Sequence, residues 1–214
     1  MKTAERLQLL YTLMYNRLGP QHWWPGETPF EVMVGAILTQ NTSWKNVERA
    51  IDNLKGVGLL SFEALSTLPI GLLAEYIRPA GYYNIKAGRL HNLLTFIREE
   101  HGGDLEAFLG QPLAPLREQL LSVKGVGPET ADSILLYAAN LPIFVVDTYT
   151  HRILSRHQVI DEDSDYHQIQ ELFMDNLAPD TRLYNEYHAL LVRVGNVYCK
   201  KKNPDCPACP LQGV

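Results

Sequence analysis

Apolar residues recur every three or four positions along most of this sequence, which is the spacing of helices that bury one face. Threonine and serine residues precede several of these stretches and glycines follow them, as expected at helix starts and ends. The pattern predicts an all-α protein of about ten helices. They are expected over residues 7–14, 28–39, 43–54, 61–65, 70–77, 85–101, 113–122, from 128 onward, 148–156, 166–177 and 181–197.

Two local patterns refine this prediction. Pro29 directly follows Thr28, and Glu31 lies three residues after Thr28. This spacing predicts a capping box at the start of a helix. Residues 143–146, Ile-Phe-Val-Val, form the one β-like stretch, and Pro142 precedes it.

Composition places the chain among ordinary globular proteins. It has 214 residues, 46% hydrophobic and 20% charged, and 24 acidic against 19 basic residues give a net charge of −5. This balance excludes a surface coated in positive charge, although a local basic stripe is still possible. The N-terminus lacks the apolar run of a signal peptide, and the longest uncharged stretch, 134–146, is too short to cross a bilayer. We therefore expect a cytosolic protein with no membrane partner.

A tight turn between two predicted helices is the first candidate site. Lys124, Gly125, Val126 and Gly127 form it, and Val126 is expected to fill the space between the helices. The exposed amides of such a turn can bind a phosphate oxygen, a contact that ignores base sequence. A bare Gly-x-Gly is also typical of an ordinary turn with glycine at a helix end, so both interpretations stand.

Asp147 is the second candidate. It lies where the apolar segment ending at Val146 meets a predicted helix, so it could simply cap that helix. It could also activate water or stabilise the positive sugar that forms when a glycosidic bond breaks. The two roles are compatible.

The third candidate is a C-terminal loop that carries Cys199, Cys206 and Cys209, beside lysines 200–202. Thiolates at this density favour zinc or an iron–sulfur cluster over a disulfide framework. A fourth cysteine after an x5 spacing would fall one residue past Val214. Either the chain continues or another group is the fourth ligand.

Together these three patterns resemble the endonuclease III-like helix-hairpin-helix (HhH-GPD) superfamily of DNA glycosylases. The family pattern is a hairpin of the form L-P-G-V-G-x-K-T-A, then V-D-T-x-x-x-R, then C-x6-C-x2-C-x5-C. Here it corresponds to residues 122–131, residues 146–152 and three of the four cysteines.

The resemblance covers nearly the whole chain and implies two helical units with a DNA cleft between them. A six-helix unit is expected at 22–140, with the helix-hairpin-helix at about 112–140. Residues 1–21 would join 141–214 in a second unit, whose loop at 199–214 would hold a 4Fe-4S cluster.

The resemblance also assigns roles in DNA binding. Gln40, in a segment similar to the family's L-L-S-A-Q-A-T, would fill the gap left by an extruded base. Tyr82, within Gly81–Ala87, would act as a wedge in the opposite strand, and the hairpin at 124–127 would bind the backbone.

One departure from the family decides the expected chemistry. Glu129 occupies the position of the catalytic lysine in bifunctional members, and a carboxylate cannot form a Schiff base. The resemblance therefore implies a monofunctional glycosylase, in which Asp147 assists attack by water and lyase activity is absent or feeble. Ala36 stands where adenine glycosylases of the superfamily carry a glutamate, so that specificity is not expected.

Further motifs resemble the 3-methyladenine glycosylase branch. They include Trp23-Trp24-Pro25, the segment 38–42 and the segment 78–84. In that branch Trp44 and a tryptophan of the N-terminal pair would sandwich the flipped base. An alkylated purine is positively charged, so two aromatic faces select it by stacking and cation–π attraction. Read without the resemblance, adjacent tryptophans before a helix are a hydrophobic staple or core anchor.

The resemblance thus predicts release of alkylated purines from damaged double-stranded DNA, by a monomer in the cytoplasm at the nucleoid. Two alternatives remain open at this stage. One is a glycosylase for oxidised pyrimidines or for mismatched thymine or uracil. The other is a protein that binds DNA damage without catalysis.

Overall fold

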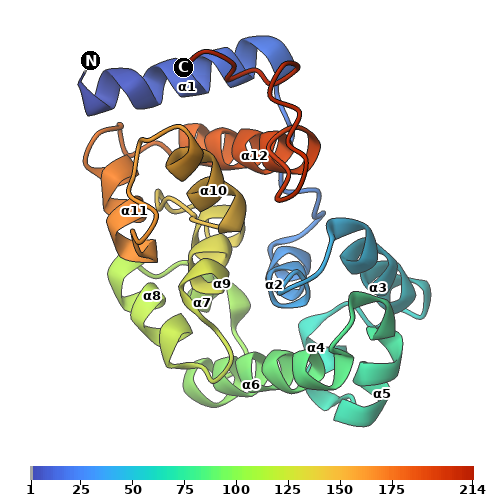
Figure 1. The fold of residues 1–214 in the computed structure, drawn as a ribbon. Coiled ribbons are helices and arrows are strands. Elements are labelled where there is room, and N and C mark those ends of the chain that lie inside the picture. Colours follow the sequence, from blue (N-terminus) through green and yellow to red (C-terminus); the bar gives the residue numbers. More distant parts are fainter. Residues whose placement is uncertain (1) are drawn as a thin grey trace. The chain divides into compact units, whose positions relative to one another are not determined.

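The computed structural model describes residues 2–214, which form helices joined by short loops (Figure 1). Helices make up 63% of the chain and no strand occurs in the described range, which confirms the all-α prediction. The chain divides into two compact units, Trp24–Leu141 and Pro142–Val214 together with the segment ending at Trp23. The predicted division into domains stays a prediction, because compactness alone does not show that either unit folds independently.

The unit Trp24–Leu141 contains eight α-helices, one 3-10 turn and one π-helical turn. These are α2 (Pro29–Leu38), α3 (Trp44–Gly56), α4 (Phe62–Thr67), α5 (Ile70–Tyr76), η1 (Arg78–Ala80), α6 (Tyr83–His101), α7 (Leu105–Leu109), α8 (Leu113–Ser122), α9 (Pro128–Ser133) and η2 (Ile134–Ala138).

Helix α2 is the centre of this unit. Every residue from Phe30 to Leu38 is buried, and all of them except Glu31 are apolar. It contacts α3, α6, α9 and η2, and α6 runs beside α4 and α5 (Figure 1). Gln40 follows the end of this buried helix by two residues.

The second unit contains α1 (Thr3–Leu18), α10 (Thr148–Arg156), α11 (Tyr166–Met174) and α12 (Thr181–Val197). Helix α12 packs against both α1 and α10 (Figure 1). The core of this second unit is aromatic. Phe144 and Phe173 are stacked with 3.7 Å between their ring centroids, and Tyr187 lies edge-on to both.

The β-like stretch at 143–146 is buried but forms no strand. Helices surround it, so no neighbouring strand is present to pair with its backbone. Side chains supply the bonds instead: Gln170 donates to the Phe144 carbonyl at 2.7 Å. The stretch therefore crosses the core as an extended connection that leads to Asp147.

Some sequence predictions of helix ends need correction. Helix α3 continues through Gly56 where a stop was expected, α11 ends at Met174 before residue 177, and the short α7 was not predicted. The predicted capping box of α2 is half formed. Thr28 accepts from the Glu31 amide at 3.1 Å, but the Glu31 carboxylate turns to the Glu27 amide and to Lys55.

Across residues 2–214 the helices are all too short or too polar to cross a lipid bilayer.

Two glycines give a matched test of packing. A Cβ on Gly195 would lie 2.4 Å from Cδ1 of Tyr149, whereas a Cβ on Gly88 in α6 would meet nothing within 4 Å. We expect Gly195→Ala to lower the free energy of unfolding by about 1–3 kcal/mol through overpacking. Gly88→Ala should raise it by about 0.5–1 kcal/mol, because alanine is the better helix former. Urea denaturation measures both, and equal effects would contradict the contact between α10 and α12.

Candidate functional site

Asp147 caps α10 with one carboxylate oxygen and faces His188 with the other. Its Oδ1 accepts from the Thr150 amide at 2.7 Å and from the Thr150 hydroxyl at 2.8 Å. Its Oδ2 lies 3.6 Å from Nε2 of His188 on α12, and 10% of the side chain is exposed. The capping role expected from the sequence is thus confirmed, and the second oxygen takes no part in the cap.

The surroundings of Asp147 favour its ionised form. Burial alone would raise the pKa of this carboxyl, but the neighbouring His188 and the bonds from Thr150 outweigh burial and hold the pKa below its usual value. Asp147 is consequently a negative charge at neutral pH, able to stabilise a developing positive charge.

Three aromatic rings gather in the other unit. Trp24 contacts Trp44 edge to face, with centroids 5.2 Å apart and planes at 85°, and Tyr137 at 5.2 Å and 50°. Trp24 also lies against α2, since a Cβ on Gly35 would be 3.0 Å from its ring. We call Trp24, Trp44 and Tyr137 the aromatic cluster.

The predicted sandwich of Trp24 and Trp44 is not preformed. A base between two parallel rings needs roughly 7 Å, which is two contacts of about 3.5 Å each, and here the rings touch directly. One ring must turn before a base can enter. Trp23, the other member of the pair, is half-buried in the second unit.

The hairpin joins α8 to α9 as predicted from residues 124–127. Gly125 has a φ of 99°, which favours glycine, and Val126 is 7% exposed between the helices. Lys124 and Gly127 are exposed. Glu129 lies exposed in the first turn of α9.

Gln40 lies against this hairpin. Its Nε2 donates to the Gly125 carbonyl at 3.1 Å and to the Thr130 hydroxyl at 2.9 Å, and its Oε1 accepts from Arg89. The side chain predicted to fill the gap in DNA is thus held by three hydrogen bonds.

Tyr82 has the geometry of a protruding side chain. Its φ of 46° lies in the left-handed region, and 69% of the residue is exposed. An aromatic residue in this conformation carries backbone strain, which is concentrated at functional sites in proteins.

The cysteine loop is anchored by arginines of α10. Arg156 donates to Sγ of Cys199 at 3.3 Å, and Arg152 donates to the Cys199 carbonyl at 2.7 Å. Cys199 is buried, Cys206 is exposed, and Cys209 lies between these extremes. Within residues 2–214 no set of three or more His, Cys, Asp or Glu side chains is arranged to hold a metal. The predicted 4Fe-4S cluster stays a prediction, and no step below depends on it.

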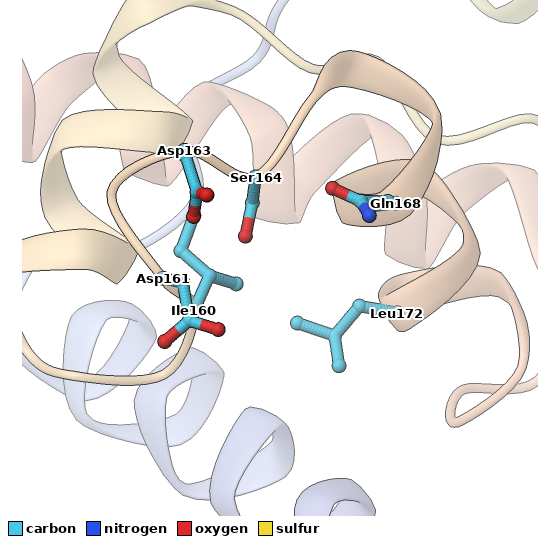
Figure 2. Close-up of a pocket in the computed structure, with 6 residues that line it drawn as sticks. All are labelled: Ile160, Asp161, Asp163, Ser164, Gln168 and Leu172. Carbon is cyan, nitrogen blue, oxygen red and sulfur yellow. The ribbon is translucent and has the colours of Figure 1, made fainter.

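One pocket lies apart from all predicted site residues. It has a volume of about 430 Å³, and Figure 2 shows the carboxylates of Asp161 and Asp163 on its lining. Gln168, on the opposite side, accepts from the Asp165 amide and helps cap α11. A lining with two carboxylates repels the phosphates of DNA, so we do not assign this pocket to the site.

Comparison with known proteins now identifies the family. Residues 34–179 match the model of the HhH-GPD superfamily of base excision DNA repair proteins. The chain belongs to this superfamily. The HhH-GPD match spans both the hairpin and Asp147, and it confirms the resemblance seen in the sequence.

Relatives of this HhH-GPD protein extend over nearly its full length. A candidate DNA repair glycosylase of Methanocaldococcus jannaschii is 50% identical over 97% of this chain and 94% of its own. Endonuclease III of Escherichia coli is 25% identical over 99% of this chain and 95% of its own.

Solved structures agree. The 3-methyladenine DNA glycosylase (MagIII) of Helicobacter pylori, bound to 1,N6-ethenoadenine, is 30% identical with a TM-score of 0.74, covering 90% of this chain and 96% of that one. A trapped endonuclease III–DNA covalent intermediate has a TM-score of 0.84 at 22% identity, covering 99% and 94%, which shows the shared fold.

Three residues of the candidate site were missed by sequence reasoning. Tyr137 is hidden in an apolar run, and the π-helical turn that carries it has no sequence mark. Arg89 is one of several charged residues on α6. His188 gave a usable signal, because it shares a helical face with the apolar Tyr184 and Leu191.

The pKa of Asp147 predicts a specific change in acid stability. A carboxyl whose folded pKa is depressed stabilises the fold above its unfolded pKa of about 3.9, and this stabilisation is lost as pH falls through the folded value. Asp147→Asn keeps the cap but cannot titrate. We expect the variant to lose less free energy of unfolding than wild type between pH 5 and pH 2, measured by denaturant titration. Parallel curves would contradict the depressed pKa.

Proposed function

We propose that this HhH-GPD protein is a monofunctional DNA glycosylase, which flips an alkylated purine of the 3-methyladenine type out of double-stranded DNA and hydrolyses its glycosidic bond. The observation that carries the proposal is Asp147, a carboxylate held ionised by His188 and the bonds from Thr150, with one oxygen that takes no part in the helix cap.

Asp147 suits the stabilisation of charge better than the transfer of a proton. As the glycosidic bond breaks, the sugar becomes positively charged, and a fixed carboxylate lowers the energy of that state. Oδ1 is occupied by the cap, so Oδ2 is the oxygen assigned to the sugar or to the attacking water. An alkylated purine is already a good leaving group, so this assistance is sufficient without a strong acid.

The aromatic cluster is proposed to select the base. Stacking and cation–π attraction both favour a cationic, alkylated ring over the neutral bases of DNA. The 30% identical H. pylori protein supports this substrate class by being a 3-methyladenine glycosylase, and its bound 1,N6-ethenoadenine, a neutral ring, supports the stacking contribution alone. We add Tyr137 to the predicted Trp23, Trp24 and Trp44, because its ring contacts Trp24.

Glu129 supports a reaction that stops at base release. A lyase step needs an amine that attacks the sugar and forms a Schiff base, and a carboxylate cannot do so. Water is therefore the proposed nucleophile.

DNA contact is assigned to the hairpin around Lys124 and Gly127, to Gln40 and to Tyr82. Backbone amides and a few lysines suffice for a local contact even though the net charge is −5. The proposed partner is a duplex with a damaged base, bound by a monomer.

Removing the charge of Asp147 tests the role of the carboxylate. Asp147→Asn keeps a capping side chain, so the protein should fold, but we expect single-turnover release of 3-methyladenine to slow about 100-fold or more. Asp165→Asn makes the same change at the cap of α11 and should leave the rate unchanged. An unchanged rate in Asp147→Asn would remove this residue from the mechanism.

Borohydride trapping tests the absence of the lyase step. Because Glu129 replaces the amine, we expect no covalent adduct when the protein is mixed with abasic DNA and borohydride. Endonuclease III, which has been trapped covalently on DNA, is the positive control. A strong adduct with this protein would show that another lysine supplies the nucleophile.

A further inference from the structure

Helix α6 carries three polar side chains that form hydrogen bonds with neighbouring segments of the chain. Lys86, Arg89 and Asn92 follow one another at three-residue spacing, which places them along one side of the helix. We call them the α6 stripe. All of their partners lie in the unit Trp24–Leu141.

Lys86 joins the segment of Gln40 to that of Tyr82. It is 1% exposed, and its Nζ donates to the Leu38 carbonyl at 2.8 Å and to the Ala80 carbonyl at 2.7 Å. These carbonyls end α2 and η1, two residues before Gln40 and two before Tyr82. Burial, with a smaller contribution from Arg89, lowers the pKa of Lys86 to about 8. A buried amine of this kind has a desolvation cost that an apolar side chain would avoid.

Arg89 joins Gln40 to the hairpin. It donates to Oε1 of Gln40, whose amide nitrogen donates in turn to Gly125 and Thr130. Its aliphatic stem lies directly under the hairpin, since a Cβ on Gly125 would be 2.4 Å from Cγ of Arg89. The orientation of the Gln40 amide is therefore fixed, because its oxygen faces a guanidinium and its nitrogen faces two acceptors.

Asn92 adds a second hold on the hairpin. Its Nδ2 donates to the Lys124 carbonyl at 2.9 Å, at the start of the turn. The stripe thus contacts the turn before Tyr82, the end of α2, Gln40 and the hairpin from one rigid helix.

We infer that the α6 stripe sets the mutual positions of Gln40, Tyr82 and the hairpin, and that Arg89 is the central positioning residue for base extrusion. The inference rests on the proposed function. Extrusion requires the gap to be filled, the opposite strand to be wedged and the backbone to be held at the same moment. A displacement of about 1 Å in such a constellation can cost on the order of 100-fold in rate. Because α6 contacts all three segments, it fixes their relative positions before DNA binds.

A double-mutant cycle tests the inference. Arg89→Met keeps the stem and removes the guanidinium, and Gln40→Ala removes its partner. We expect Arg89→Met to slow single-turnover base release about 10-fold or more, while affinity for undamaged duplex changes less than about 2-fold, since no phosphate contact is assigned to Arg89. The double variant should be no slower than the slower single variant, because both changes break one unit. Arg89→Lys should recover part of the rate.

Two further variants provide a matched control and a second test of the stripe. Arg98→Met alters an arginine of the same helix whose guanidinium donates to the Ser66 carbonyl, and it should leave base release unchanged. Asn92→Ala removes a single, exposed hydrogen bond to the hairpin, and it should slow release because the stripe positions the hairpin. Additive losses in the Gln40–Arg89 cycle, or a wild-type rate in Arg89→Met, would overturn the inference.

Failure of the proposed function would appear differently. If wild type released no base from any lesion, the proposed function would be wrong. The same cycle would then be read from the fluorescence of 2-aminopurine placed opposite a tetrahydrofuran abasic analogue, which reports gap filling and displacement of the opposite base without chemistry. Equal fluorescence in wild type, Arg89→Met and Gln40→Ala would overturn the inference in that case too.

Discussion

Every helix leaves amides unpaired at its start and carbonyls unpaired at its end, and a protein of short helices has many such ends to satisfy. In this chain side chains satisfy them repeatedly. Five helices besides α10 begin with a residue whose side chain accepts a hydrogen bond from an amide of the first turn. These residues are Thr28, Ser61, Asp104, Asp165 and Asp180. The residues assigned to the reaction and to its positioning meet the same need. Asp147 caps the start of α10, and Lys86 binds the carbonyls that end α2 and η1.

This constraint explains how one carboxylate can have two roles. The cap fixes the rotation of Asp147 through Oδ1, and His188 together with the bonds from Thr150 keeps the carboxylate ionised, so that Oδ2 is held in one place. Electrostatic assistance to bond breaking depends on this kind of preorganisation, because no reorientation is then required as charge develops. The amide of Gln40, which we propose contacts DNA, is fixed in the same way by hydrogen bonds to the hairpin and to Arg89.

The fold was largely predictable, and the reasons are local. Helical spacing and capping residues predicted most helices because those features act within a few residues of one another. The buried stretch at 143–146 was ambiguous, since its apolar residues suit a strand as well as a core connection. The helices packed around it determine that it forms a connection.

The predicted site residues each belong to a short motif. Arg89 and Tyr137 escaped because their partners, Gln40 and Trp24, lie 49 and 113 residues away in the sequence, and no local pattern marks such contacts. The position of His188 on an apolar helical face was visible in the sequence, but its pairing with Asp147, 41 residues away, was not.

The central claim is that an ionised Asp147 and an aromatic cluster together release alkylated purines by hydrolysis. Its most direct test is base release by the wild-type protein from a panel of duplexes with a single modified site each. The panel comprises 3-methyladenine, 1,N6-ethenoadenine, thymine glycol and a G·T mismatch. The account predicts release of the cationic 3-methyladenine, with intact abasic strands as product. Release of thymine glycol or mismatched thymine, with the alkylated purines left in place, would contradict it.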